Sequence, residues 1–404
     1  MKDFKSADRI QDLQLFGEFG GVNPSISDSS TFTFLQAKTM ADVFEGKIEG
    51  CYLYSRHWNP SNLYLSKAIA RLEGTESALV TASGMAAISS TLMQLCSTGD
   101  EIVSSRTIYG GSYALMKNFL PKFGINTKFV DTTDIQQVAQ ATSKQTKLIY
   151  CETMSNPMLE ITDIRELSKL AKANNCLLII DNTFSPLIFS PAEMGADIVI
   201  HSLTKFINGM SDCVAGAICG SQEFINSLYD VNSGAAMLLG PVLDSHRSAS
   251  ILKNIKTLHI RMQQHARNAL SLAQHLQADG YRIIYPGLKN HPQHALLKEI
   301  AHSKYGAGGL FVIDLKEKDR ANRFMELMQE ANIGYLAVSL GSYKTLFSAP
   351  GGSTSSEIPE QERIEMGLTE GLVRISIGLD DDIERTYTRM SQCLEKIDAK
   401  SKTP

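Results

Sequence analysis

Two segments of the chain carry side chains that could act together in a reaction. The apolar run 177–180 leads directly into Asp181, and a second apolar run, about 20 residues further on, leads into Ser202, Thr204 and Lys205. Continuous apolar runs of this length are typical of buried parallel strands, and ligands of an open parallel sheet bind beyond the carboxyl ends of its strands. The sequence therefore predicts a carboxylate, two hydroxyls and an amine at one edge of a sheet.

A third segment, Thr-Ala-Ser-Gly-Met-Ala-Ala at 81–87, joins an expected strand to an expected helix. The amide N–H groups at the start of such a helix have no partner in the helix and can bind an anion. An amine, a carboxylate and a phosphate site at strand ends are what pyridoxal 5′-phosphate (PLP) requires. Lys205 would bond covalently to the aldehyde of PLP, and Asp181 would keep the ring nitrogen protonated, so that the ring can accept electrons.

The two hydroxyls fit the same hypothesis. Ser202 and Thr204 are two residues apart, so in an extended segment both can point toward the phosphate oxygens. Taken singly, each feature has a commoner explanation, because an Asp after a strand often caps a helix and Ser-x-Thr-Lys is usually a turn. The combination favours the cofactor.

The stretch 177–209 resembles the PLP attachment region of the Cys/Met metabolism enzymes. This family includes methionine γ-lyase, cystathionine γ- and β-lyases, cystathionine γ-synthase and O-acetylhomoserine sulfhydrylase, and the resemblance extends from about residue 15 to residue 397. It implies an α/β protein of the PLP-dependent transferase-like class, fold type I. A large domain with a mainly parallel sheet and a smaller α+β C-terminal domain are expected.

The resemblance also assigns residues to the phosphate of the cofactor. Ser83, Gly84 and Met85 match the phosphate-binding loop of the family. Tyr54 and Arg56 match a pair that reaches the phosphate of a neighbouring subunit's cofactor, and the forked guanidinium of Arg suits a phosphate. A homo-oligomer is therefore expected, with a dimer as the minimum and a dimer of dimers, a homotetramer, as the fuller assembly.

Four further residues are assigned to the ring and the substrate. Tyr109 matches the tyrosine that stacks on the pyridine ring, Asn156 matches an asparagine near the ring hydroxyl and the substrate carboxylate, and Ser339 and Arg374 match the substrate-carboxylate site. From the pattern alone, Tyr109 would be a packing residue and Arg374 a solvent-facing strand residue. A buried arginine there would need an anion such as an amino-acid carboxylate. His201 is interpreted as structural.

The family implies that Lys205 removes the proton at Cα of an amino acid and then one at Cβ. Tyr109 is the candidate acid for the leaving thiolate. The apolar Val338 favours a methionine γ-lyase-type α,γ-elimination, which gives a thiol, ammonia and 2-oxobutanoate, because a buried unpaired ammonium of cystathionine would be costly. Gly111, where known methionine γ-lyases carry a cysteine, and the unusual run 346–353 depart from the family pattern.

Three alternatives stay open. The first is a γ-replacement enzyme, either O-acetylhomoserine sulfhydrylase or cystathionine γ-synthase, and the second is a cystathionine γ- or β-lyase. The third is a degenerate scaffold without activity, which loss of Lys205 or Asp181 would favour, but both residues are present.

Composition excludes several other classes. The 404 residues have a net charge of −4, which gives no electrostatic reason to bind nucleic acid or an anionic membrane. The seven cysteines are widely spaced without a Cys-x-x-Cys pair, so neither a disulfide scaffold nor a metal site is expected. The N-terminus has no apolar signal segment, and a cytoplasmic location is expected.

The elements that must position these residues fall into three parts. Residues 1–58 are expected to form an irregular arm that contacts a neighbouring subunit, 59–257 the PLP-binding domain and 258–404 the C-terminal domain. Apolar periodicity predicts helices over 62–72, 85–95, 163–173, 262–276, 318–331 and 381–396. Strands are predicted over 101–104, 127–130, 148–151, 177–180, 198–200, 215–219, 282–285, 310–313, 335–338 and 373–377.

Overall fold

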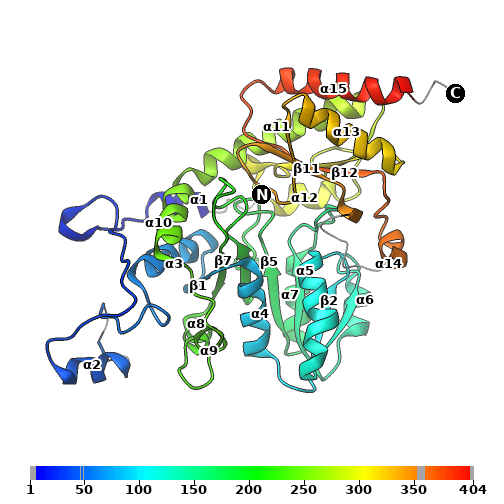
Figure 1. Ribbon diagram of the computed structural model, residues 1–404. Helices are drawn as coiled ribbons and strands as arrows, with labels where there is room; N and C mark the ends of the chain where they lie inside the picture. Colours follow the sequence, from blue (N-terminus) through cyan, green and yellow to red (C-terminus); the bar gives the residue numbers. More distant parts are fainter. Residues whose placement is uncertain (1–5, 46, 49, 353–359, 401–404) are drawn as a thin grey trace.

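The computed structural model describes residues 6–45, 47–48, 50–352 and 360–400, which build two β-sheets with helices packed on them (Figure 1). The larger sheet has seven strands in the order β1-β7-β6-β5-β4-β2-β3. Their bounds are β1 Ser77–Thr81, β2 Glu101–Ser105, β3 Asn126–Val130, β4 Thr146–Glu152, β5 Leu177–Asp181, β6 Ile198–Ser202 and β7 Gly216–Gly220. Strands β6, β5, β4, β2 and β3 are parallel, and β7 and β1 complete the edge in antiparallel pairs. The prediction of a mainly parallel sheet is confirmed.

Helices cover this sheet because its central strands are apolar on both faces. They are α3 Pro60–Glu73, α4 Gly84–Leu95, α5 Gly110–Ala114, α6 Ile135–Ala141, α7 Ile164–Ala173, α8 Gln222–Leu228, α9 Ala235–Leu239 and α10 Ser245–Asn254. Local sequence sets their ends. Asn59 caps α3 by accepting the Ser61 N–H, and the helix stops at Gly74, whose φ of 75° is the left-handed conformation that glycine adopts without strain.

The smaller sheet has five strands in the order β10-β11-β12-β9-β8. Its strands are β8 Arg282–Ile284, β9 Leu310–Asp314, β10 Gly334–Leu336, β11 Thr345–Ser348 and β12 Leu372–Ser376. Its helices are α11 Leu258–Ala278, α12 His294–Ile300, α13 Lys318–Glu330, α14 Glu360–Glu365 and α15 Ile383–Lys400. Strand β11 was not predicted from the sequence. It pairs with β12 opposite Arg374, in the centre of the sheet.

The N-terminal arm contains two short helices, α1 Ser6–Gln11 and α2 Ala37–Phe44, where the sequence predicted none. Six and eight residues are too few for apolar periodicity to show in a window of 11 or more. Helix α1 packs on the body, where Arg9 forms a 2.6 Å ion pair with Glu193. The rest of the arm, with α2 at its far end, extends away from the body (Figure 1).

No helix in the described part of the chain is both long and apolar enough to cross a membrane. Within the same residues, His, Cys, Asp and Glu side chains do not gather in a group of three or more that could hold a metal ion.

Candidate active site

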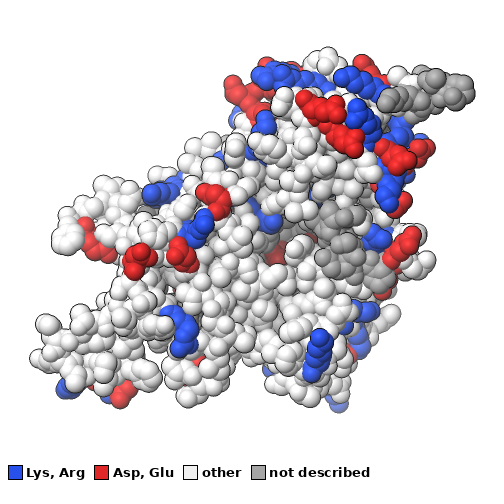
Figure 2. All heavy atoms as spheres, in the orientation of Figure 1, with Lys and Arg blue, Asp and Glu red and all other residues white. Residues whose placement is uncertain are grey.

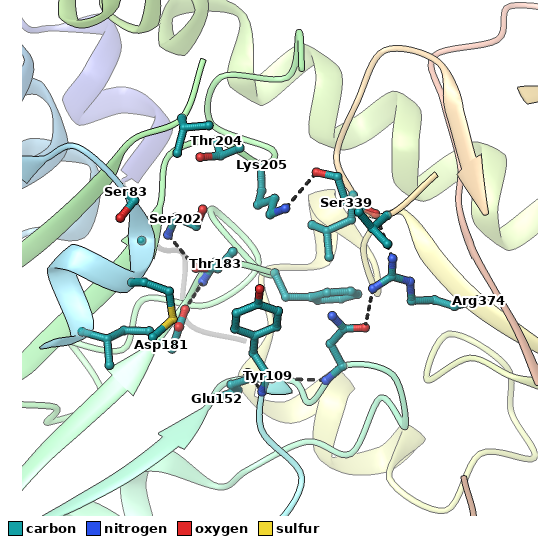
Figure 3. A pocket seen from close by; sticks show the side chains of 18 residues that line it. Ser83, Tyr109, Glu152, Asp181, Thr183, Ser202, Thr204, Lys205, Ser339 and Arg374 are labelled. Atoms are coloured by element: carbon teal, nitrogen blue, oxygen red, sulfur yellow. Dashed lines mark hydrogen bonds between the residues drawn. The ribbon is translucent and has the colours of Figure 1, made fainter. Parts of the chain in front are cut away.

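A cavity of about 310 Å³ lies at the carboxyl ends of β4, β5 and β6, between the two sheets (Figure 3). The large sheet contributes the last residue of each of these strands, and the small sheet contributes Arg374 from β12. Most of the residues that the sequence assigned to the site line this one cavity: Ser83, Gly84, Met85, Tyr109, Asn156, Asp181, Ser202, Thr204, Lys205, Ser339 and Arg374.

Lys205 follows β6 by three residues, and its side chain projects into the cavity, where Nζ donates a 2.8 Å hydrogen bond to Ser339 Oγ (Figure 3). Burial lowers the pKa of the amine from 10.5 to about 8, and the charge of Arg374 acts in the same direction. About a tenth of this amine is therefore unprotonated at pH 7 and about half at pH 8, far more than for an ordinary lysine, and a nucleophile or base requires this form.

Asp181 ends β5 and is only 7% exposed. Its carboxylate accepts the Thr183 N–H at 2.9 Å and the Tyr150 hydroxyl at 3.2 Å. Burial raises its pKa, while these hydrogen bonds act in the opposite direction. No Lys or Arg among the described residues forms an ion pair with it, so a cationic group in the cavity would find a preformed partner.

The start of α4 forms a compact cradle. Ser83 caps this twelve-residue helix by accepting the Ala86 N–H at 3.0 Å. A Cβ on Gly84 would lie 2.8 Å from Ser202 Cβ, so only glycine allows the end of β6 to approach the helix this closely. The helix N-terminus and the Ser202 hydroxyl on the cavity wall suit a phosphate.

Thr204 also lines the cavity, but its hydroxyl is already engaged. It donates to the Ala215 carbonyl at 3.2 Å and accepts the Ala215 N–H at 3.0 Å. The Thr204 hydroxyl thus holds the segment before β7 against the loop that carries Lys205. Only one lone pair of its oxygen remains available to a ligand.

Arg374 is 2% exposed, so the solvent-facing placement suggested by the sequence pattern alone is wrong. Its side chain leaves the face of β12 toward the cavity, where Asn156 and the segment at Ser339 cover it. The guanidinium donates to Asn156 Oδ1 at 3.2 Å and to the Ser339 carbonyl at 3.0 Å. Its Nε has no hydrogen-bond partner among the described residues, and burial lowers its pKa to about 10. A buried cation that faces a cavity in this state is suited to a carboxylate.

Tyr54 and Arg56 are not part of this cavity. They lie at the base of the arm, where Arg56 donates to the Met237 carbonyl at 2.6 Å and its guanidinium lies 5.8 Å from the centre of the Tyr54 ring. Their assignment to a neighbouring subunit's cofactor therefore stays a prediction.

Several wall residues were not singled out from the sequence: Ile88, Glu152, Thr183, Phe184, Val214 and Leu340. Glu152 could have been found, because it ends β4 just as Asp181 ends β5, and the two are partners in the sheet register. His201 is fully buried and lies 2.7 Å from Glu73, as expected for a structural residue.

Solved structures share this fold over nearly the whole chain. Cystathionine gamma-lyase from Lactobacillus plantarum is 30% identical with a TM-score of 0.87, over 97% of this chain and 100% of that one. A structure from Campylobacter jejuni is 27% identical with a TM-score of 0.89, over 97% of this chain and 100% of its own, and contains N′-pyridoxyl-lysine-5′-monophosphate. The protein thus has the α/β architecture of fold type I PLP-dependent enzymes, as the sequence predicted.

The family can also be stated. The family described as Cys/Met metabolism PLP-dependent enzyme matches residues 10–394, and the chain belongs to it. A methionine gamma-lyase from Arabidopsis thaliana is 43% identical over 93% of this chain and 87% of its own length. The predictions of a PLP cofactor and of a lyase acting on sulfur amino acids are confirmed.

The cavity fits this cofactor on its own chemistry. It combines a buried amine of lowered pKa, a buried carboxylate without a Lys or Arg partner among the described residues, and a helix N-terminus that Gly84 allows to lie close to the Ser202 hydroxyl. These would hold the aldehyde carbon, the ring nitrogen and the phosphate, through Lys205, Asp181 and the start of α4 respectively.

Proposed function

We propose that the protein catalyses the α,γ-elimination of methionine or a close analogue, which consumes one water and releases a thiol, ammonia and 2-oxobutanoate. One observation carries this choice of substrate. The only carboxylates on the described cavity wall are Asp181 and Glu152, and both are engaged with groups of the protein itself. Val214, Val338 and Leu340 add apolar surface to the same wall. The distal ammonium of cystathionine would find no free carboxylate on this wall once Asp181 faces the ring nitrogen, whereas the thioether of methionine needs none.

PLP, when bound, supplies the electron sink that makes the substrate Cα acidic. Arg374 and Asn156 hold the substrate carboxylate, which fixes the side chain of the substrate against the apolar wall. The Lys205 amine, held by the Ser339 hydroxyl at 2.8 Å, takes the protons from Cα and then Cβ. The Tyr109 hydroxyl, which points into the same space in Figure 3, donates a proton to the leaving thiolate.

A comparison of substrates tests the proposal. The protein is incubated separately with methionine, cystathionine, cysteine, and O-acetylhomoserine with and without sulfide, and the 2-oxo acid and thiol are quantified. We expect the highest kcat/KM for 2-oxobutanoate formation with methionine. A Val338→Glu variant should lose methionine turnover and gain turnover of cystathionine, because it adds the missing carboxylate. Faster turnover of cystathionine by the unaltered protein would refute the assignment.

A γ-replacement enzyme is the second candidate, because the ester of an acylated homoserine is uncharged and fits the same apolar wall. The same incubations separate the two reactions. Homocysteine formed from O-acetylhomoserine and sulfide, at a kcat/KM above that of elimination from methionine, would identify replacement.

We also propose that residues 1–58 are an arm, 59–257 the cofactor-binding part and 258–404 the C-terminal part. The described part of the arm beyond α1 packs on a second copy of the chain and places Tyr54 and Arg56 at the phosphate held by that copy's cofactor-binding part. The arm exposes large apolar side chains, among them Phe16, Val22 and Leu35. Charged side chains crowd over α13 and α15 and are sparser over the arm (Figure 2). Apolar surface of this extent is typical of an interface, and a dimer of dimers is the assembly we expect.

A location in the cytoplasm is part of the proposal. All seven cysteines are unpaired, and six of them are buried, which suits a reducing compartment.

A further inference from the structure

Glu152 is a buried carboxylate in the cavity wall that the reaction above does not use. It ends β4, is 8% exposed, and its two oxygens accept hydrogen bonds from two separate segments. Oε1 accepts the backbone N–H of Tyr109 at 2.8 Å, and Oε2 accepts the backbone N–H of Asn156 at 3.2 Å (Figure 3). One side chain therefore joins the start of α5 to the loop after β4.

These two segments carry opposite ends of the site. Tyr109 presents its phenol to the cavity, while Asn156 accepts a hydrogen bond from Arg374 through Oδ1. Glu152 thus connects the group that faces the leaving thiolate with the pair that faces the substrate carboxylate. Because both contacts are to backbone N–H groups, they locate the two segments without occupying either functional side chain.

The carboxylate is costly at this position. Glu152 is the register partner of Asp181 on the neighbouring parallel strand, so two acidic side chains are buried next to each other. Burial, and then the charge of Asp181, raise the pKa of Glu152 to about 8. No Lys, Arg or His among the described residues forms an ion pair with it. An apolar residue would avoid this cost, but it would leave the two buried N–H groups without acceptors.

We propose that Glu152 is a positioning residue of the lyase reaction, whose two carboxylate oxygens hold the Tyr109 phenol and the Asn156–Arg374 pair in a fixed relation to each other. The inference rests on the proposed functions of Tyr109 and Arg374. No proton or bond of the substrate changes at Glu152, which acts only through the segments that it holds.

The test is the Glu152→Gln variant with Glu160→Gln as its matched control. Gln has the same size, but its amide offers one acceptor oxygen, and its NH₂ group would face the second N–H donor. Glu160 lies on the loop after β4, which also carries Asn156. It accepts the Thr107 hydroxyl at 2.9 Å and does not line the cavity. The same change of charge and shape is thereby made nearby without touching either contact.

Two readouts are measured on the holoenzyme. The first is hydrogen exchange of the Tyr109 and Asn156 amides at single-residue resolution; the next residue, Pro157, has no amide proton that could interfere. The second is the separation of kcat from KM for methionine. Leaving one of the two N–H groups without its acceptor should lower kcat/KM by about 10- to 100-fold. We expect a lower kcat, through Tyr109, and a higher KM, through Arg374, together with faster exchange of both amides.

The Glu160→Gln control should keep both amides and both kinetic constants near their original values. Both variants should still bind the cofactor, seen as a retained absorbance band, because Lys205 and Asp181 are intact. Unchanged amide exchange in Glu152→Gln, or a loss of kcat with KM unchanged, would overturn the proposal. If Glu152→Gln does not fold, hydrogen exchange of the unaltered protein still tests the proposal. Fast exchange of its Tyr109 and Asn156 amides would overturn the proposal, and strong protection would support it. The exchange measurement needs no substrate. If the proposed reaction is wrong, the unaltered protein will not turn over methionine, but the difference in amide exchange between Glu152→Gln and the unaltered protein will still be seen.

Discussion

Replacing Lys205 should stabilise the cofactor-free protein, and the size of the effect follows from the lowered pKa of its amine. The pKa falls from 10.5 to about 8 on folding because the amine is buried beside Arg374. Between these two values the unfolded chain binds more protons than the folded one, so stability rises with pH in that window. Below pH 8 both states are protonated and the penalty is fully present, at about 3 kcal/mol.

The Lys205→Met variant removes the charge with little change of shape. We expect its free energy of unfolding at pH 7 to exceed that of the unaltered protein by about 2–3 kcal/mol, after allowance for the lost hydrogen bond to Ser339. At pH 10 the charge penalty falls to about 1 kcal/mol, and with the same allowance for the hydrogen bond the gain should shrink to about zero. Urea unfolding of both cofactor-free proteins at equal concentration measures the difference. Equal stability at pH 7, or a gain that does not change with pH, would refute the pKa and its cause.

Three further outcomes are expected. The rate at which the cofactor-free protein captures PLP should rise with pH and level off above about 8, because only the unprotonated Lys205 amine attacks; a flat profile in stopped-flow absorbance would contradict this. Arg374→Gln should raise KM for amino acids by about 100-fold in steady-state assays without changing cofactor absorbance, because it removes the buried cation that holds the carboxylate; loss of the cofactor would assign Arg374 another function. Arg56→Ala subunits mixed with Lys205→Ala subunits should regain activity that neither has alone, because the hybrid contains one complete site; no recovery would place Arg56 in its own subunit's site.

The sequence predicts the cofactor side of the site well because local signals mark it. Asp181 and Ser202 each end a strand that begins with an apolar run, and Ser83 precedes a helix with a recognisable cap. Such features need only a few consecutive residues. The parallel sheet then brings them to one edge, so their proximity follows from the topology.

The substrate side could not be derived in the same way. Lys205 and Ser339 are 134 positions apart, and they meet only because the small sheet packs over the end of the large one. Arg374 is buried because Asn156 and the segment at Ser339 contact its guanidinium, and neither contact can be read from the sequence around position 374. Those assignments required the family resemblance. Glu152 shows the opposite case, since its position at a strand end was readable, but its hydrogen bonds to two backbone amides were not.

The charged groups of the site are each in an unfavourable state before a ligand binds. Arg374 is a buried cation without a carboxylate partner among the described residues, Asp181 is a buried anion without a Lys or Arg, and Lys205 is an amine whose charged form is destabilised by both burial and Arg374. A substrate carboxylate would give the Arg374 cation a partner, and a protonated ring nitrogen would do the same for the Asp181 anion. The lowered pKa of Lys205 supplies a base near neutral pH. The carboxylate would also reduce the effect of Arg374 on Lys205 and raise the amine's basicity once substrate is bound. Binding and proton abstraction are therefore coupled through Arg374, and a substrate without a carboxylate should lose kcat as well as affinity.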